Sequence, residues 1–315
     1  MVNSGLYQNN KKNEWDNFVR NSRTPIFFFQ RDFMEYHSDR FIDHSLMFYI
    51  EKSLVAILPA NKNEDTLISH GGLTYGGLIC SPKIRADGTV TIIKHLLEVA
   101  KEQGFKNIIY KTVPYIFYQQ PAQDDIYALF NVAKGSLIRR DLSSIIDLKE
   151  RMSLSKGRKW LIARAKKSKL VITTSTDWAS FYSLLTIVLQ KHGAKPVHSV
   201  AELVLLHDLF PQNIELKVIL HEGQMVAATL LFKLSKVIHT QYMAVSDTGK
   251  ELGALDYLID TCINESAAQG VNYFSFGIST EQNGSFLNEG LLAQKESFGA
   301  RALCLDFYEV NLNAC

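Results

Sequence analysis

One stretch, residues 237–299, combines a strand, a turn, a helix, a second strand and a polar loop: VIHTQYMAVSDTGKELGALDYLIDTCINESAAQGVNYFSFGISTEQNGSFLNEGLLAQKESFG. A period of two over residues 237–245 predicts a strand, and residues 247–249 have the composition of a turn. Apolar residues within 252–263 recur at the three-and-four spacing of one helix face, and residues 271–276 predict the next strand. The rest of the chain supports or repeats this unit.

The start of the predicted helix is a candidate anion site. Its first backbone N–H groups have no partner within the helix, and Gly249 and Gly253 allow close approach of a ligand. A phosphate or pyrophosphate would suit such a helix end. The alternative is an ordinary crossover helix that follows a glycine turn, because a lone glycine pair is a weak motif.

Composition places the chain among globular proteins. It has 315 residues, of which 46% are hydrophobic and 21% charged, enough for two domains of ordinary size. The formal net charge is +2, with 34 basic and 32 acidic residues, so no overall field directs it to nucleic acid or membrane. Only a local basic patch could do so.

No targeting or metal-binding pattern stands out. The N-terminus lacks an apolar core and no apolar run has the length of a membrane span, which predicts a soluble, cytoplasmic protein without a transmembrane segment. The four cysteines form no CxxC pair and have no histidine at ligand spacing, so we expect free thiols and no metal site: Cys80, Cys262, Cys304 and Cys315.

The first half has the same order of elements as the second. Predicted strands at 45–50 and 54–59 form a hairpin, and residues 67–79 read as a strand interrupted by two Gly-Gly pairs. Such pairs suggest a bulge or a close backbone approach. A helix over 89–103 and a strand over 108–113 follow.

Landmarks in the two halves are separated by nearly constant offsets of 163, 171 and 166 positions: Trp15 and Trp178, Val55 and Val226, Gly104 and Gly270. This predicts a tandem repeat of one α/β unit, with domains at residues 1–150 and 151–315. Two unrelated α/β domains are the alternative.

A basic segment, residues 153–169, lies between the halves and contains seven cations and no acid. A solvated helix normally interleaves acids with bases, so this segment is either an unusual linker helix or a surface that meets phosphates of a nucleotide, a lipid or an RNA. Trp160 is the only aromatic residue within it.

These residues carry a resemblance to a known family. The pieces are Phe28-Phe29-Gln30 with Phe33, residues 69–73, residues 158–171, and Phe276-Gly277-Ile278-Ser279 followed by residues 295–299. Together they resemble the GNAT acyltransferase fold in tandem, as in the Fem-type peptidoglycan bridge transferases. The resemblance implies an α/β fold with two GNAT-like domains, each a mixed, mostly antiparallel sheet flanked by helices.

The resemblance also implies a co-substrate. GNAT enzymes bind the pyrophosphate of acyl-CoA at a Q/R-x-x-G-x-G/A loop, which aligns with residues 250–255, although Lys250 and Leu255 depart from the pattern. Acyl-CoA, such as acetyl-CoA, would then contact Gly249, Lys250 and Gly253, with no tightly bound cofactor. Fem-type enzymes use aminoacyl-tRNA instead, and many carry a helical-hairpin arm for which no segment is found here.

By matching position, Lys295 corresponds to a Fem-family lysine that contacts substrate phosphate or supports acyl transfer, and Arg158 and Arg164 lie in a segment resembling a phosphate-binding one. Attack by an amine develops negative charge on oxygen, which a fixed cation stabilises. Glu281 or His239 would assist deprotonation of the amine, against the alternatives of a surface acid and a structural histidine. We expect an acceptor pocket between the repeats that involves His70, Gly71, Tyr75, Gln241, Asn283 and Asn288.

The sequence thus favours an N-acyltransferase that moves an acyl group from acyl-CoA to an amine. The expected acceptor is an amino sugar or another cell-envelope or polysaccharide precursor, linked to a nucleotide or a lipid. Two alternatives stay open: a Fem-type transferase that uses aminoacyl-tRNA, and a catalytically inactive double-GNAT scaffold. The oligomeric state is left open.

Overall fold

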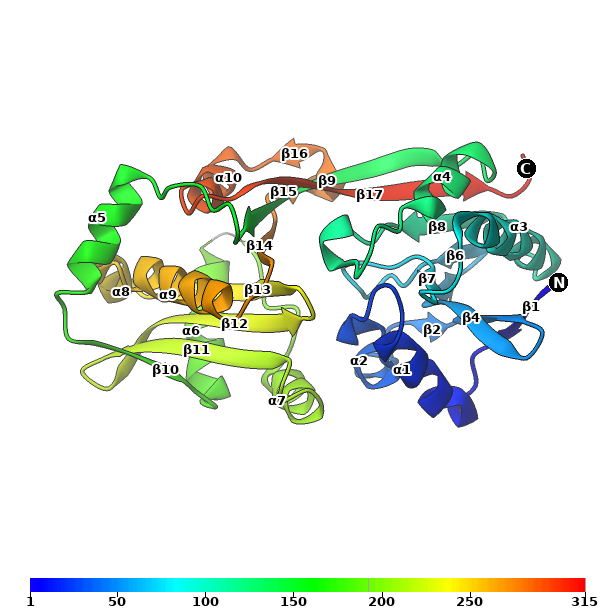
Figure 1. Ribbon diagram of the computed structural model, residues 1–315. Helices are drawn as coiled ribbons and strands as arrows, with labels where there is room; N and C mark the ends of the chain where they lie inside the picture. Colours follow the sequence, from blue (N-terminus) through cyan, green and yellow to red (C-terminus); the bar gives the residue numbers. More distant parts are fainter. Residues whose placement is uncertain (192, 315) are drawn as a thin grey trace. The chain divides into compact units, whose positions relative to one another are not determined.

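The chain folds into two compact units in a computed structural model that describes residues 1–191 and 193–314 (Figure 1). The first unit contains residues 1–141, 281–286 and the segment that begins at Cys304, and the second contains 142–280 and 287–303. Both are α/β units with mixed, mostly antiparallel sheets, which confirms the expected fold class. Cys315 lies outside the described residues.

The division of the chain differs from a single boundary between residues 150 and 151. Two long strands, β9 (Ser136–Asp147) and β17 (Arg301–Asn311), each contribute residues to both units. The two units therefore do not follow one another as separate lengths of sequence, which a repeat read from landmark spacing would not reveal.

The first unit has two groups of strands. One is a sheet in the order β1-β3-β4-β7, and the other runs β9-β17-β8-β6-β5-β2, in which only β6 and β8 pair in parallel. The strands are β1 (Val2–Leu6), β2 (Ile42–Asp43), β3 (Leu46–Ile50), β4 (Ser53–Leu58), β5 (Asn61–Asn63), β6 (Thr66–Ile68), β7 (Ile79–Cys80) and β8 (Asn107–Lys111). The helices are η1 (Asn9–Lys11), α1 (Lys12–Arg20), η2 (Phe27–Phe29), α2 (Arg31–Glu35), α3 (Ala86–Glu102), η3 (Tyr115–Phe117) and α4 (Asp124–Asn131).

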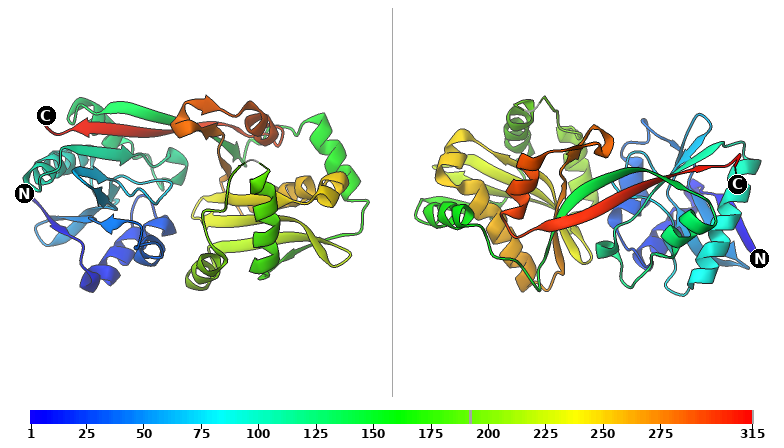
Figure 2. Two further views of the ribbon diagram at one scale, coloured as in Figure 1. Left: turned by 180° about the vertical axis from the view of Figure 1, so that it is seen from behind. Right: turned by 90° about the horizontal axis from the view of Figure 1, so that it is seen from above.

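The second unit is built on strands in the order β10-β11-β12-β13-β14-β9. Its strands are β10 (Leu170–Thr174), β11 (Ile214–His221), β12 (Gln224–Leu234), β13 (Val237–Val245) and β14 (Tyr273–Ile278). Its helices are α5 (Lys156–Ala165), α6 (Trp178–Gln190), α7 (Val200–Leu209), α8 (Asp247–Leu252), α9 (Ala254–Ala268) and α10 (Glu289–Glu296). Within this unit α9 covers one face of the sheet and α6 the other (Figure 2). The remaining short elements are β15 (Thr280–Glu281), η4 (Gln282–Gly284) and β16 (Phe286–Leu287).

The strand and the helix predicted within residues 237–263 are both present, as β13 over residues 237–245 and as α9. Residues 247–249, predicted as a turn, are instead the first turn of α8, which meets α9 at Gly253. On the apolar face of α9, Leu258, Ile259 and Ile263 are fully buried and pack against the sheet. Burial of each such side chain contributes about 1.5–3 kcal/mol, which fixes α9 against β11, β12 and β13.

The predicted strand over 67–79 is wrong in its middle, because the chain between β6 and β7 forms a loop. The glycine pairs explain the loop. A side chain at Gly76 would lie 1.9 Å from the carbonyl oxygen of Ser69, and one at Gly77 would lie 2.7 Å from the ring of Tyr110. The glycines therefore mark a close backbone approach, as expected, and not a strand.

Among the residues that the structure describes, no helix is both long and apolar enough to cross a membrane.

Candidate active site

The candidate site lies where the two parallel strands of the second unit separate. β13 and β14 pair over three residues only, ending at His239 and Ser275, while β13 continues to Val245. The carboxyl ends of neighbouring parallel strands are where open α/β sheets bind ligands. The first side chain at this point is His239.

β13 is irregular just beyond His239. On its other edge Leu230 lies opposite Tyr242 but Leu231 lies opposite Thr240, so Gln241 is the extra residue of a β-bulge. The bulge breaks the two-residue alternation that predicted His239 and Gln241 on one face. Gln241 is half-buried at this position.

A buried ammonium reaches the end of β14. Lys295 on α10 is 3% exposed, and its Nζ donates to the carbonyl oxygens of Gly277, at 3.0 Å, and Ile278, at 2.5 Å. An ammonium carries three donors, so these bonds leave one. Desolvation lowers the pKa of Lys295 to about 8.

His239 lies beside the same peptide. Gly277 has φ +72°, and a Cβ there would lie 3.3 Å from Cε1 of His239. The Nδ1 of His239 is 3.1 Å from the Oγ of Ser275. Burial and, to a lesser extent, the charge of Lys295 lower the pKa of His239 to about 4, so the imidazole is neutral near pH 7. The hydroxyl of Ser279, two residues after Gly277, is buried and has no hydrogen-bond partner within the described residues.

Asn288 fixes the helix that carries Lys295. Its Oδ1 accepts from the backbone N–H of Leu291 at 2.9 Å, which caps α10, and its own N–H donates to the carbonyl of Ser279 at 2.9 Å. Asn288 thus joins the start of α10 to the end of β14, and its predicted contact with substrate stays a prediction.

Glu281 and Asn283 lie in exposed positions of the segment 281–286, which belongs to the first unit. The Oδ1 of Asn283 accepts from Nη1 of Arg139 at 3.1 Å. Their roles at the site stay predictions.

At both glycines of the predicted diphosphate cradle, the space that a Cβ would take is filled by neighbouring backbone. A side chain at Gly249 would lie 2.2 Å from the carbonyl oxygen of Val226, and one at Gly253, where φ is +70°, would lie 2.6 Å from that of Leu161. The exposed Lys250 pairs with Asp247, a carboxylate in the first turn of α8, at 3.3 Å. Packing of β12 and α5 therefore explains why both positions are glycine.

Arg158 is similarly engaged within the second unit. Its guanidinium pairs with Asp256 on α9, donates to Ser297 Oγ at 2.8 Å, and lies 4.1 Å from the centre of the Phe298 ring. These contacts fasten α5 to α9 and to the end of α10. Arg164 is instead exposed, 5.4 Å from the ring centre of Trp160.

In the first unit, the predicted substrate residues surround a lysine that sequence reasoning missed. Lys111 on β8 donates to the carbonyls of His70, Gly71 and Leu73 at 2.9, 3.2 and 2.6 Å. Burial, and then the charge of Arg139, lower the pKa of Lys111 to about 8. His70 is 3% exposed and Tyr75 is 2% exposed, so both side chains are enclosed by protein. A single lysine at the end of a strand gives no sequence signal for this role.

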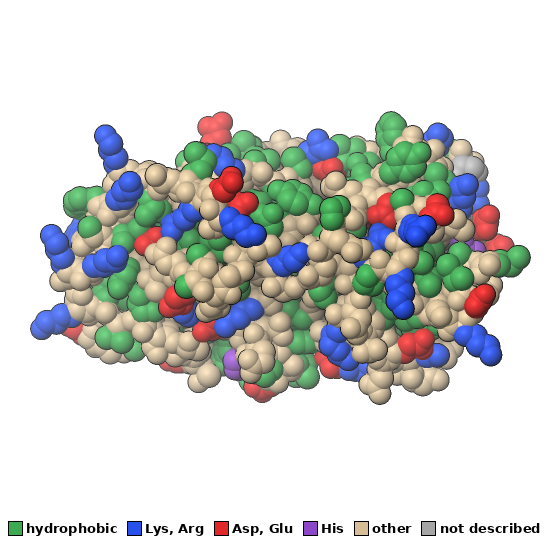
Figure 3. All heavy atoms as spheres, in the orientation of Figure 1, with side chains coloured by type: hydrophobic (Ala, Val, Ile, Leu, Met, Phe, Trp, Pro, Cys, Tyr) green, Lys and Arg blue, Asp and Glu red, His purple; other side chains and the backbone are tan. Residues whose placement is uncertain are grey.

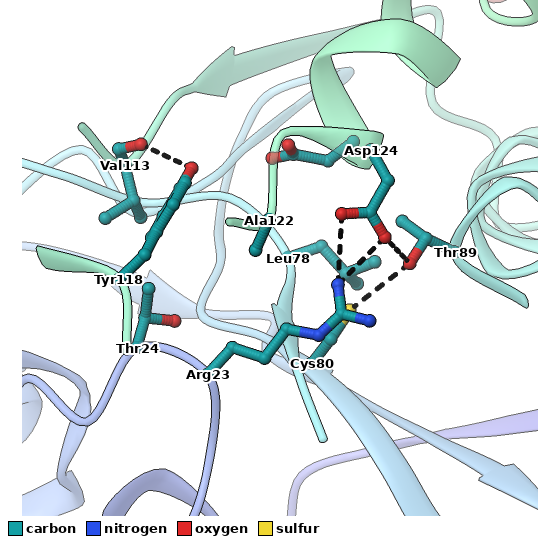
Figure 4. A pocket seen from close by; sticks show the side chains of 10 residues that line it. Arg23, Thr24, Leu78, Cys80, Thr89, Val113, Tyr118, Ala122 and Asp124 are labelled. Carbon is teal, nitrogen blue, oxygen red and sulfur yellow. Dashed lines mark hydrogen bonds and ion pairs between the residues drawn. The ribbon is translucent and has the colours of Figure 1, made fainter. Parts of the chain in front are cut away.

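A small cavity of the first unit lies where α3 and α4 begin (Figure 4). Its volume is about 20 Å³, room for roughly one or two water molecules. The Nη1 of Arg23 donates to both oxygens of Asp124, at 2.8 and 3.0 Å, and Thr89 Oγ1 donates to the same carboxylate. Burial raises the pKa of the neighbouring Asp125 to about 6.

In the first unit the strands before and after α3, β7 and β8, lie in different sheets, whereas β13 and β14, before and after α9, pair in parallel. The cavity beside α3 is lined by the ion pair of Arg23 and Asp124. The second unit, in which Lys295 keeps a donor unused, is the better candidate for a reaction. Residues 1–191 and 193–314 hold no group of three or more side chains arranged to bind a metal ion.

Comparison with known families identifies a domain in the same unit. Residues 149–283 match the family model described as acetyltransferase (GNAT) domain. No curated protein matches the chain in sequence.

Solved structures share the fold over nearly the whole chain. FemX is 10% identical with a TM-score of 0.69, covering 96% of each chain. The C-terminal domain of a putative lysylphosphatidylglycerol synthetase from Agrobacterium fabrum is 11% identical with a TM-score of 0.62, covering 96% of this chain and 91% of that one. A tandem GNAT protein from the clavulanic acid biosynthesis pathway is 12% identical with a TM-score of 0.52, covering 99% of each chain. The chain thus has a Fem-like, tandem GNAT fold, as the sequence predicted.

Proposed function

We propose that the second unit is an N-acyltransferase, because residues 149–283 match the acetyltransferase (GNAT) domain model and the chain has a Fem-like fold. It moves an acyl group from an activated donor, acyl-CoA, to the amine of an acceptor. The observation that carries the proposal is the buried ammonium of Lys295 at the point where β13 and β14 separate, with one N–H donor unused.

Lys295 acts on the charge that develops in the reaction. When an amine attacks a thioester or ester, the carbonyl oxygen becomes an oxyanion, and a preorganised donor aimed at it lowers the barrier. The carbonyls of Gly277 and Ile278 hold the ammonium in place before the reaction starts. Loss of one such donor typically costs about 10²- to 10³-fold in turnover.

His239 orients the attacking amine. Its Nδ1 is occupied by Ser275, which leaves Nε2 as the nitrogen that can meet a substrate. With a pKa of about 4 the ring is neutral and can accept a hydrogen bond from an amine N–H, although it is a weak base. We therefore assign it positioning of the amine. After the attack solvent removes the amine proton, and the oxyanion collapses to the amide as the C–S bond breaks and the CoA thiolate leaves to solvent.

The free edge of β13 supports acyl-CoA as the donor. From Thr240 to Val245 this strand pairs with β12 on one side, and on the β14 side the described part of the chain provides no partner strand. The two amides of a pantetheine arm can bond to such an edge as an added peptide strand does. The diphosphate would then bind outside the turn of Gly249 and Gly253, because protein fills those positions.

The packing of protein against the turn of Gly249 and Gly253 also favours a second candidate for the acyl donor, the ester of an aminoacyl-tRNA. Such a donor does not present a diphosphate to the start of α9. The likeness to FemX supports this reading. Lys295 and His239 would have the same roles.

For the acceptor we propose an amino sugar or another cell-envelope or polysaccharide precursor. The likenesses to FemX and to a putative lysylphosphatidylglycerol synthetase support a cell-envelope acceptor.

The test is a direct transfer assay with the full chain. Radiolabelled acetyl-CoA, longer acyl-CoAs and aminoacyl-tRNA are each offered with a panel of amino sugars and nucleotide-linked amino sugars. Acylated product with a CoA thioester supports the first candidate, and product with aminoacyl-tRNA alone supports the second. If no donor binds in calorimetry and no product forms, the protein is a binding scaffold and the proposal fails.

A further inference from the structure

The exposed face of α5 and of the residues that follow it carries cations and no acid. Residues 151–176 contain no Asp or Glu, and six cations of this region are exposed: Lys156, Lys159, Arg164, Lys166, Lys167 and Lys169. Lys and Arg side chains gather over α5, at the left of Figure 3. The face is defined here as the α5 surface.

The orientation of α5 is fixed by its opposite face. Ile162 and Ala165 are buried, and Arg158, on the same side of the helix, is tied to Asp256 and Ser297. At 100° per residue these positions lie together, and Lys156 and Trp160 lie on the other side of α5. The α5 surface therefore points away from the core of its unit.

An indole stands at the centre of this surface. Trp160 is 60% exposed, whereas the other two tryptophans, Trp15 and Trp178, are 0% and 6% exposed. Arg164 lies 5.4 Å from the Trp160 ring, so a cation borders the indole directly. A solvated helix would be expected to carry acids among its bases, and the α5 surface carries none.

We propose that the α5 surface docks on an anionic lipid bilayer, with Trp160 at the level of the headgroups. Each Lys or Arg near a negatively charged leaflet strengthens binding, and an amphipathic indole favours the membrane interface. A single-stranded RNA would need a row of stacking aromatic side chains along a groove, whereas Trp160 is the one aromatic residue within residues 153–169. The inference concerns where the protein acts and does not depend on the acyl donor.

The test uses the full chain and vesicles of phosphatidylcholine with or without phosphatidylglycerol. We expect co-sedimentation and a blue shift of Trp emission with the anionic vesicles only, both weakened by salt. The shift should be absent in Trp160→Phe, because the other tryptophans are buried. Lys159→Glu with Lys167→Glu should weaken binding by tenfold or more.

A matched control separates local from overall charge. Lys52 and Lys94 are exposed lysines of the first unit, and their double change to Glu alters the net charge equally. This control should retain vesicle binding. Loss in both double variants would show non-specific attraction and overturn the proposal, as would binding to tRNA in a gel shift without binding to vesicles. No binding to either would show that the α5 surface is only solvated, which also overturns it.

Discussion

Lys295 and Gly277 are joined by a 3.0 Å hydrogen bond from the ammonium to the carbonyl oxygen, and Lys295 uses one further donor on Ile278. The first unit contains a comparable buried lysine, Lys111, but all three of its donors meet carbonyl oxygens. The two lysines share burial and a pKa lowered to about 8. They differ in whether a donor is left for a substrate.

This difference predicts an asymmetric effect of removing each ammonium. We expect Lys295→Met to reduce kcat for acyl transfer about 10²-fold or more, because the oxyanion loses its donor. Lys111→Met, the matched control, removes an equally buried ammonium that holds only the loop after β6. It should leave kcat within a few fold of wild type, provided that circular dichroism shows a folded protein. Equal losses in both folded variants would assign Lys295 a structural role.

Stability should depend on pH through Lys295. Burial lowers the pKa of Lys295 from its ordinary value of 10.5 to about 8, so between these values the unfolded chain binds more protons than the folded one. The free energy of unfolding therefore rises with pH across this window. From pH 7 to pH 9 the contribution of Lys295 is about 1 kcal/mol.

The measurement compares wild type with Lys295→Met in urea unfolding at pH 7 and pH 9. Lys111 is present in both proteins, so its own contribution cancels in the difference. Wild type should gain stability relative to the variant as the pH rises. An unchanged difference would mean that the ammonium is not desolvated.

The periodic parts of the fold could be predicted from sequence, and the long-range pairings could not. The helix pattern within 252–263 identified α9 because its buried face recurs along one helix. Nothing local shows that Arg23 pairs with Asp124, or that Arg158, read as a phosphate ligand, pairs with Asp256. A cation has the same sequence signal whether its partner is a carboxylate of the protein or a phosphate.

The candidate site could be predicted only in part, because its long-range contacts and the strand register have no local sequence signal. Lys295 and His239 were both candidates, and the structure brings them to the same peptide at Gly277. The bulge at Gln241 was not foreseen, because alternation along one strand says nothing about its register with the next. The sequence did not predict that Asn288 caps α10, because a capping asparagine and a ligand-binding asparagine are the same residue type.

Gly253 is required both by its positive φ and by the close backbone of Leu161, and a glycine of the first unit allows the two effects to be measured separately. Gly104 has φ +84° and would meet nothing within 4 Å, so Gly104→Ala measures the strain of a positive φ alone, about 1 kcal/mol. At Gly253 the added methyl also meets the carbonyl of Leu161, which should cost roughly 1–3 kcal/mol more. Chemical unfolding of the two variants gives the comparison. Similar losses would mean that α5 shifts easily and that the turn can open for a ligand.

Substitution of Arg158 tests whether this residue binds substrate phosphate or stabilises the fold through Asp256. Arg158→Ala leaves Asp256, which is 9% exposed, without its guanidinium partner, and we expect a loss of roughly 3 kcal/mol in the free energy of unfolding. Lys159→Ala, one residue along on the exposed side of α5, should change stability by no more than about 0.5 kcal/mol.

A double-mutant cycle with Asp256→Ala completes this test. Because the two side chains are in direct contact, the double variant should be less destabilised than the sum of the single variants, with a coupling of roughly 0.5–3 kcal/mol. A different result would support the prediction that Arg158 binds phosphate. In that case Arg158→Ala would unfold like wild type, while its KM for a phosphate-bearing acceptor would rise and that of Lys159→Ala would not.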